Sequence, residues 1–495
     1  MLSDKFFKAA LSGGKILASV LSCFLTVGCA LAQSPSGIPD AGGTLSSGWS
    51  DNEGVSQQVF FTYGQPEQEG PDAPYSQEAL REGVFLRRSH HSGQLTQKAV
   101  QLMRQGDLEA GRQILWDALA YAPNNSRAYS LLAQIYFWRG EDADALAILE
   151  QAGRYQIKGD RVYGFLDRAL PFFRHKDRNA SALPLVSVAR FKDNKQCAVS
   201  FNFDDGSKTV YTRILPVFDK YGYKATVLIN PGGTADQPDN AYFGSWGEWK
   251  DAAGRGHEIG NHSMNHRYLM QVPDDVFDSE IRESYRLITE KIGCPPLSFA
   301  FPFDQSTPER VRQVAGLHPA VRERHYLSQI DDNVFLPVYG GDKFSASIGR
   351  KLIDFMLIKR LWVIAECHAV QTEEVMTFKP ITMEFLEDHL SYIQEQEDRI
   401  WVDTFANTYC YMAERRASRL SVLKSQPGRL VFVLDHNLDK SVYRMPLTVV
   451  VNASPLKPSS AVAWREGKEL PVMIRGTYIM LDILPGPTPV VVAWD

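Results

Sequence analysis

Between Cys197 and Arg415, short apolar runs alternate with segments in which apolar residues recur every three or four positions. The short runs are typical of buried strands, and the three-to-four repeat is typical of helices. The expected strands are Cys197–Phe203, Lys224–Asn230, Leu297–Phe303, Leu361–His368 and Ile400–Ala406, and the expected helices are Thr209–Tyr221, Asp274–Ile292 and Met383–Glu397. This alternation favours an α/β fold with parallel strands and helical crossovers, of which a closed barrel is one form.

A repeat precedes this region. Small residues at Gly106, Gly111 and Ala118 recur 34 positions later as Gly140, Ala145 and Ala152. That period is typical of tetratricopeptide helix pairs, in which small residues let the helices approach closely. We therefore expect tetratricopeptide-like helical repeats over 75–180, with an Ala-rich helical hairpin as the plainer reading. Repeats of this kind offer a surface for a protein partner.

The pattern changes again after Ser421. Short Val-rich runs separated by turn signals are typical of a small antiparallel sandwich, which we expect over 421–495. The expected strands are Arg429–Leu434, Leu447–Asn452, Ala461–Trp464, Pro471–Arg475, Tyr478–Ile483 and Val490–Trp494. No row of aromatic residues follows one strand face, so the pattern favours a structural cap over a carbohydrate-binding module.

The first 32 residues are typical of a signal peptide, because lysines precede an apolar run that ends before an A-x-A site at Ala30–Ala32. The apolar run is too short to span a membrane, so the mature chain is expected to have no transmembrane segment. We expect export to the periplasm or the exterior, with lipid anchoring at Cys29 as the less favoured alternative. Residues 33–74 are rich in Ser, Gly, Pro, Asp and Gln and are expected to form a disordered linker.

Composition narrows the classes of function. The 495 residues are 44% hydrophobic and 22% charged, as in ordinary globular proteins, and their net charge is -5. A chain with this balance has no basic field to attract phosphates, which argues against nucleic acid as a partner. In an oxidising compartment Cys197, Cys294, Cys367 and Cys410 allow three pairings, but their wide spacing favours buried thiols.

Two groups of residues carry candidate chemistry. Asp204 and Asp205 follow the first expected strand, at the carboxyl end where α/β folds place their active sites. His262 and His266 are four positions apart, so one helical turn would bring both imidazoles to one face. Two histidines and a carboxylate with open positions are typical of a catalytic site for a divalent transition metal.

The segments FNFDDG, HEIGNHSMNH and FAFPFD, the late His368, and WVDTF near the end resemble the motifs of the polysaccharide deacetylase family of carbohydrate esterases. The resemblance covers about residues 195–415, and we set the catalytic domain at 190–418. It implies a distorted (β/α) barrel that removes acetyl groups from an acetylated polysaccharide, with Zn²⁺ as the expected divalent metal.

The resemblance also implies a role for each residue. Asp205, His262 and His266 look like the metal ligands, Asp204 like the general base, and His368 like the acid that protonates the leaving group. The backbone N–H of Phe303 would hold the oxyanion, and Phe303 and Trp401 would line the substrate pocket. A buried core histidine is the plainer reading of His368.

Three positions depart from the family pattern. Ala300 stands where the family commonly has the Arg that orients the base, Asp304 replaces a Gly, and Glu366 replaces a Leu. These departures leave the substrate class open. Hydrolysis of N-acetyl groups is the leading hypothesis; the alternatives are an O-acetyl esterase and a non-catalytic envelope scaffold or sugar-binding protein.

Overall fold

The computed structural model of this chain describes residues 84–155, 162–163, 166, 185–234, 240–341 and 344–495. The expected signal peptide and linker lie outside these residues. The described residues up to 166 belong to one compact unit and those from 185 onward to another. None of the described helices has the length and apolar character needed to cross a bilayer.

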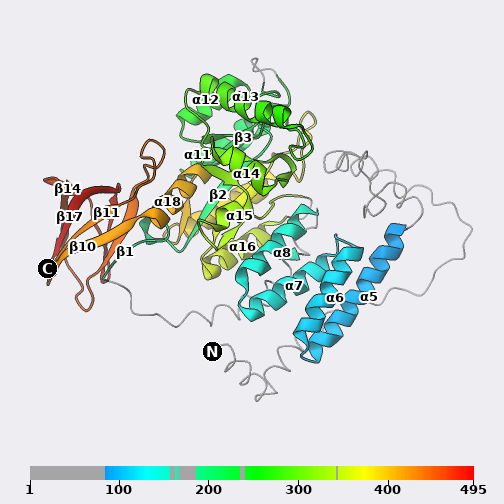
Figure 1. The fold of residues 1–495 in the computed structure, drawn as a ribbon, viewed down its shortest axis with the longest axis horizontal. Coiled ribbons are helices and arrows are strands. Elements are labelled where there is room, and N and C mark those ends of the chain that lie inside the picture. The colour runs from blue at the N-terminus through cyan, green and yellow to red at the C-terminus, as the bar shows by residue number, and fades with distance from the viewer. Residues whose placement is uncertain (1–83, 156–161, 164–165, 167–184, 235–239, 342–343) are drawn as a thin grey trace, which may run out of the picture. The chain divides into compact units, whose positions relative to one another are not determined.

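The first unit consists of helices packed side by side (Figure 1). They are α5 (Val84–Arg104), α6 (Leu108–Tyr121), α7 (Ser126–Arg139) and α8 (Asp142–Arg154). Asp107 caps α6 by accepting a hydrogen bond from the Ala110 N–H at 3.0 Å. A Cβ atom added at Gly111 would lie 2.9 Å from Cγ of Met103 in α5, so the repeated small residue does permit close helix packing. Helices α6 and α8 begin 34 residues apart, in agreement with the period of the sequence.

A parallel sheet forms the centre of the second unit. Its described strands are β2 (Cys197–Phe203), β3 (Thr226–Ile229), β4 (Glu258–Asn261), β5 (Ser298–Ala300), β6 (Ala320–Arg322), β7 (Val334–Phe335), β8 (Trp362–Cys367) and β9 (Ile400–Val402). They follow the order β6-β5-β4-β3-β2-β8-β7, with β9 paired to the first half of β2. This arrangement confirms the expected distorted (β/α) barrel.

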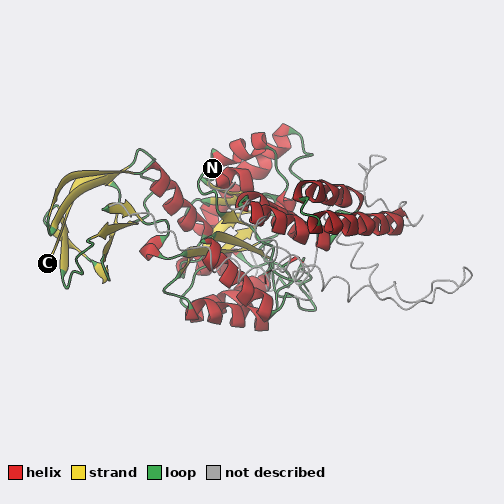
Figure 2. Cartoon of the chain, turned by 90° about the horizontal axis from the view of Figure 1, so that it is seen from below, coloured by secondary structure: helices red, strands yellow, loops and turns green. Residues whose placement is uncertain are grey.

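Helices connect and cover these strands (Figures 1 and 2). They are α11 (Leu215–Lys220), preceded by the π-helical turn η3 (Val210–Ile214), α12 (Trp246–Gly254), α13 (Asp274–Ile292), α14 (Pro308–Ala315), α15 (Arg324–Ser328), α16 (Ala346–Lys359), α17 (Met383–Glu395) and α18 (Phe405–Ala417). The short 3-10 turns η2 (Lys192–Asn194) and η4 (Pro302–Asp304) lie before β2 and after β5.

Two expected strands are shorter than the sequence indicated. The strand expected at Ile400–Ala406 ends at Val402 because the Thr404 hydroxyl accepts a hydrogen bond from the Asn407 N–H at 3.2 Å and so caps α18. The strand expected at Leu297–Phe303 ends at Ala300. There the chain turns, because Phe303 and Asp304 adopt left-handed backbone angles, with φ of 62° and 53°.

The expected antiparallel sandwich follows α18. One sheet contains β10 (Arg419–Gln426), β11 (Arg429–Asp435), β17 (Gly486–Trp494), β13 (Ala461–Arg465) and β14 (Lys468–Leu470), and the other contains β1 (Val186–Val188), β12 (Leu447–Asn452), β16 (Tyr478–Ile483) and β15 (Met473–Arg475). Strand β1 precedes the parallel sheet in the sequence yet pairs with β12. The sandwich is therefore built from both sides of the barrel segment.

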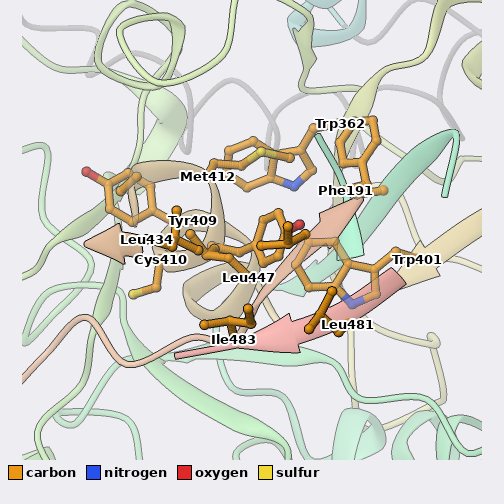
Figure 3. Packing of buried hydrophobic residues seen from close by; sticks show 14 of the residues in the cluster. Phe191, Trp362, Trp401, Tyr409, Cys410, Met412, Leu434, Leu447, Leu481 and Ile483 are labelled. Carbon is orange, nitrogen blue, oxygen red and sulfur yellow. The ribbon is translucent and has the colours of Figure 1, made fainter. Parts of the chain in front are cut away.

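The sandwich and the parallel sheet share one hydrophobic core. Trp362 of β8 and Tyr409 of α18 belong to the same buried cluster as Leu447 of β12 and Leu481 of β16 (Figure 3). Helix α18 runs between the two parts, and its buried Glu414 accepts a hydrogen bond from the Met445 N–H at 2.8 Å. The sandwich thus packs against the end of the barrel that carries β9.

The four cysteines expected as buried thiols are all free. Cys197, Cys367 and Cys410 are buried, whereas Cys294 is exposed.

Candidate metal centre and active site

Asp204 and Asp205 follow β2 directly, and the turn after them separates their carboxylates. Asp205 and Gly206 both adopt left-handed backbone angles, with φ of 71° and 67°. Such an angle is uncommon for a non-glycine residue such as Asp205 and is typical of a turn. A Cβ at Gly206 would lie 3.1 Å from Cγ2 of Ile229, so the turn packs closely on β3. As a result Asp205 clusters with His262 and His266, and Asp204 clusters with Glu366 and His368.

The two histidines lie in an irregular loop after β4, so the expectation of a helical turn was wrong. Left-handed φ values of 65° at Ser263 and 55° at His266 break any helix there. Asn261 shapes the loop by accepting a hydrogen bond from the Ser263 N–H at 3.0 Å, and the Ser263 hydroxyl accepts one from the His266 N–H at 3.1 Å. The loop still brings the two imidazoles to a ring separation of 5.0 Å.

Hydrogen bonds to buried polar side chains fix the position of this loop. The Asn261 amide donates to the Ser284 hydroxyl at 2.8 Å and lies 3.0 Å from Nε2 of His318. Glu280 of α13 accepts hydrogen bonds from the backbone and side-chain N–H groups of Asn265, both at 2.8 Å. The position of the histidines is therefore determined by helix α13 and strand β4 together.

The donor atoms of Asp205, His262 and His266 fit one metal ion. Oδ1 of Asp205 lies 3.7 Å from Nε2 of His262 and 3.3 Å from Nε2 of His266. Ligand atoms about 2.1 Å from one tetrahedral ion lie about 3.4 Å apart, which agrees with both distances. Nδ1 of His262 lies 2.9 Å from the Ala300 carbonyl oxygen, which can only accept, so Nδ1 carries the proton and Nε2 keeps its lone pair.

Burial and neighbouring charges shift the pKa values of Asp205 and His262. Burial opposes ionisation of Asp205, but His266, His368 and His262 outweigh burial and lower its pKa. Burial also lowers the pKa of His262, against the opposing effect of Asp204. An ionised carboxylate and neutral imidazoles are the forms in which these side chains bind metal.

Arg322 holds Asp204 in place, and the sequence reasoning missed it. Its Nη1 and Nη2 atoms donate to Oδ1 and Oδ2 of Asp204 at 2.8 and 2.6 Å, a bidentate pair between two buried side chains. Arg322 ends β6, and its backbone pairs in register with Ala300 of β5. The guanidinium that the family pattern places at Ala300 is thus provided by the neighbouring strand.

The same guanidinium lies beside the two other departures from the family pattern. Its Nη2 is 3.2 Å from Oδ1 of Asp304 and 3.8 Å from Oε2 of Glu366. Burial and the nearby Asp304 raise the pKa of Glu366 well above its ordinary value, against the opposing effect of Arg322. The three departures from the family pattern are therefore connected. The arginine lies on β6 at Arg322 instead of on β5 at Ala300, and Asp304 and Glu366 place two carboxyl groups beside it.

His368 and Phe303 also lie at this end of the sheet. His368 follows β8, and its ring packs edge-on against Phe378 with centroids 5.2 Å apart. Its Nδ1 is buried and has no hydrogen-bond partner among the described residues. The Phe303 ring lies 4.6 Å from that of His266.

Trp401 does not join this group, so its expected place in the substrate pocket was wrong. Its partner in the sheet is Ala198, near the start of β2, whereas Asp204 follows the end of that strand. The Trp401 side chain is buried in the cluster shared with the sandwich (Figure 3). Its ring packs against that of Tyr411, with centroids 5.0 Å apart. Because β9 pairs with only the first half of β2, its residues cannot reach the carboxyl end.

Comparison with known proteins identifies two regions of the chain. Residues 191–320 match the polysaccharide deacetylase family, and residues 102–166 match the tetratricopeptide repeat. The chain therefore contains a polysaccharide deacetylase domain preceded by tetratricopeptide repeats. The first match includes the Asp204, Asp205, His262, His266 and Phe303 positions and ends before Arg322 and His368.

Curated relatives match part of the chain. A peptidoglycan-N-acetylglucosamine deacetylase from Bacillus cereus is 29% identical over 110 residues, which cover 22% of this chain and 47% of the relative. A gellan lyase from a Bacillus species is 20% identical over 290 residues, which cover 54% of this chain and 11% of the relative. The chain thus spans less than half the length of either protein.

Comparison with solved structures matches part of the chain to a family 4 acetyl xylan esterase from Clostridium thermocellum in complex with a cobalt ion. It is 21% identical, with a TM-score of 0.32, and the match covers 43% of this chain and 90% of the esterase.

Proposed function

We propose that this chain is an exported, metal-dependent deacetylase that hydrolyses N-acetyl groups of a polysaccharide. The observation that carries the proposal is that the adjacent residues Asp204 and Asp205 belong to two different groups of side chains. Asp205 completes a three-ligand group with His262 and His266, while Asp204 is fixed by Arg322 next to that group. A divalent ion at the three ligands, for which we propose Zn²⁺, would supply Lewis acidity to a water and to the acetyl carbonyl.

In this proposal Asp204 is the general base. Oδ2 of Asp204 lies 3.9 Å from Nε2 of His262, so its carboxylate is directly beside the ligand atoms. The bidentate bond to Arg322 fixes the direction of the carboxylate before substrate arrives, and such preorganisation lowers the cost of reaching the transition state. Asp204 then accepts the proton of the attacking water.

His368 is the proposed general acid. A ring nitrogen of His368 lies within 4.8 Å of a carboxylate oxygen of Asp204, so base and acid lie close enough to act on one acetyl group. The proton from His368 goes to the leaving amine, which departs as the free amino group of the sugar. The backbone N–H of Phe303 is the proposed donor to the oxyanion, supported by the position of Phe303 next to His266.

The remaining parts of the proposal concern place and partners. Export to the periplasm or exterior is supported by the signal-like residues 1–32, and the acetylated polysaccharide substrate is supported by the deacetylase domain. The tetratricopeptide repeats support a protein partner.

Acetate release tests the proposal. The purified chain is incubated with chitooligosaccharides, peptidoglycan fragments and acetylated xylan, before and after removal of metal by a chelator. We expect release from an N-acetylated substrate, loss of release with the chelator, and recovery with Zn²⁺. Release from acetylated xylan alone would assign the site to O-acetyl esters. No release from any substrate by the metal-loaded chain would favour the non-catalytic scaffold.

A further inference from the structure

A cavity of about 290 Å³ lies at the opposite end of the parallel sheet from the candidate metal centre. Gln196, which lines it, directly precedes β2, whereas Asp204 directly follows that strand. Arg360, also on its wall, lies two residues before β8, whereas His368 follows that strand. At about 3.3 Å per strand residue, the cavity is about 25 Å from the metal centre. Strands β1, β12 and β16 of the sandwich complete its walls.

The wall of this cavity is positively charged. It includes Arg190, Lys195 and Arg360 and no carboxylate. Arg190 is neutralised by Asp331, to which it donates two hydrogen bonds at 3.0 and 2.6 Å. Within the described part of the chain, the side chains of Lys195 and Arg360 have no acidic partner. Two cations therefore remain available, in a protein whose overall charge is negative.

The neutral polar groups of the wall also offer donors. Oε1 of Gln196 accepts hydrogen bonds from Arg399 at 3.3 and 3.2 Å, and Oδ1 of Asn452 accepts one from the Ser454 N–H at 3.1 Å. Both oxygens are therefore occupied by donors of the protein, and both amide NH₂ groups have no partner among the described residues. A wall that presents ammonium, guanidinium and amide N–H groups is suited to an anion.

The cavity also has an apolar surface, which a small inorganic anion would not use. Phe191, Val450 and Tyr478 line the cavity; Phe191 and Val450 are buried, and Tyr478 is partly exposed. Its volume is close to the lower end of small-molecule sites, which begin at about 300 Å³, and a sugar ring with its substituents needs space of this order. The partly exposed Tyr478 beside charged donors fits the ring face of a sugar that carries a carboxylate.

We propose that this cavity binds an acidic sugar unit, with Lys195 and Arg360 as the groups that recognise its carboxylate. The site is separate from the deacetylase chemistry and does not depend on it. On a polymer that reaches both ends of the barrel, a second contact would raise the effective concentration of substrate at the metal centre.

Calorimetric titration of the full chain tests this site, with trigalacturonate as the acidic probe, maltotriose as the matched neutral trisaccharide, and inorganic phosphate as the bare anion. We expect trigalacturonate to bind at least tenfold more tightly than either other probe, and less tightly as salt is added. The Lys195→Gln/Arg360→Gln variant should lose at least tenfold in affinity. A control that removes two exposed charges on β10 and β11, Lys424→Gln/Arg429→Gln, should bind as the unchanged chain does.

Equal binding of maltotriose, or unchanged affinity in the Lys195→Gln/Arg360→Gln variant with an unchanged melting temperature, would overturn the proposal. Phosphate that binds as tightly as trigalacturonate would reduce the site to a general anion site and also overturn it. Acetate release from neutral oligosaccharides should be the same in this variant and the unchanged chain. Failure of the deacetylase assay would leave the binding result unaffected.

Discussion

Three carboxyl groups surround one guanidinium in the candidate site, and two of them, those of Asp204 and Glu366, are buried. Arg322 contacts Asp204 and Asp304 and lies 3.8 Å from Glu366. Burial and the charge of Asp304 raise the pKa of Glu366 well above its ordinary value, against the opposing effect of Arg322. The raised pKa favours the uncharged form of Glu366, and the bidentate pair of Arg322 is made with Asp204.

Substitution of the adjacent aspartates separates their roles. Asp205→Asn replaces a charged metal ligand by a weaker neutral one, so bound metal and activity should fall together. Asp204→Asn leaves the three ligands in place, so metal content should be unchanged while kcat falls by about 10²-fold or more, the usual scale for loss of a general base. Metal analysis and acetate release on both variants provide the measurement. Near-full activity of Asp204→Asn with metal bound would make Asp304 or Glu366 the candidate base.

The candidate residues were largely accessible from the sequence because each follows a short apolar run or belongs to a dense motif. Asp204, Asp205, His262, His266 and His368 were all predicted, and the structure brings them together. Arg322 was missed because nothing near it in the sequence marks it. Its role arises only from the lateral pairing of two short strands, which local patterns do not specify.

At the scale of elements, the register between β5 and β6 explains how Arg322 can take the place of the arginine that the family pattern has at position 300. Ala300 and Arg322 are paired neighbours on adjacent strands, so a guanidinium from either position starts from nearly the same height in the sheet. Arg322→Ala should strongly reduce activity and stability, because removal of one partner from a buried ion pair costs about 3–5 kcal/mol. Adding Ala300→Arg to Arg322→Ala should recover a measurable part of kcat.

Two controls make this exchange informative. Ala300→Arg alone should destabilise the chain, because Ala300 is fully buried and Arg322 already occupies the space beside Asp204. Arg322→Lys should recover less activity than the exchange, since an ammonium cannot form the bidentate pair. A double variant that folds and binds metal but shows no more activity than Arg322→Ala would refute the register argument.

The packing of α16 against α17 predicts an acid-sensitive element. His389 of α17 is fully buried, packs against Phe385, and neither of its ring nitrogens has a hydrogen-bond partner among the described residues. Burial lowers its pKa to about 3, against the opposing effect of Asp388. The folded state therefore keeps His389 neutral, while the unfolded chain takes up a proton near pH 6.5. Its contribution to stability is present above pH 6.5 and is lost as the pH falls towards 3.

His389→Leu removes this proton linkage. Between pH 6.5 and 3 the free energy of unfolding of the unchanged chain should fall by up to about 1.4 kcal/mol per pH unit through this residue, and the variant should be spared that loss. Urea unfolding at pH 7.5 and pH 4.5 measures the difference. The stability of the variant relative to the unchanged chain should increase at the lower pH. An equal difference at both pH values would mean that His389 is not held neutral.

Elements were predicted well where they are long and amphipathic. Helix α13 has the predicted bounds, Asp274–Ile292, because its buried residues recur at helical spacing over 19 positions. Strands β4, β6 and β7 were missed because they contain two to four residues, too few for a period to be seen. The loop of His262 and His266 was mistaken for a helical turn because a spacing of four fits both conformations.

At the scale of the molecule, the sequence suggested separate barrel and sandwich domains, but their side chains form one core. The cluster that contains Trp362 and Trp401 continues without interruption into Leu430, Leu447 and Leu481 of the sandwich. Polar contacts cross the same boundary, since Glu414 of α18 binds the Met445 N–H and lies 3.1 Å from Nε2 of His436. The change in the hydrophobic pattern near Ser421 thus marks the change from helix α18 to strand β10.

A truncated chain tests whether this shared core makes the two parts one folding unit. Residues 184–418 lack strands β10–β17, so the apolar side chains of α18 and β8 would meet water and Glu414 would lose its partners. Exposure of this apolar surface removes hydrophobic stabilisation from the core. We expect this fragment to aggregate or to lack a cooperative melting transition. Residues 184–495 keep β1 and the whole core, and should melt in one transition and retain bound metal. Calorimetry of both fragments gives the answer. A monomeric 184–418 fragment that melts cooperatively and binds metal would show that the barrel folds without the sandwich, and that the common core is only an interface.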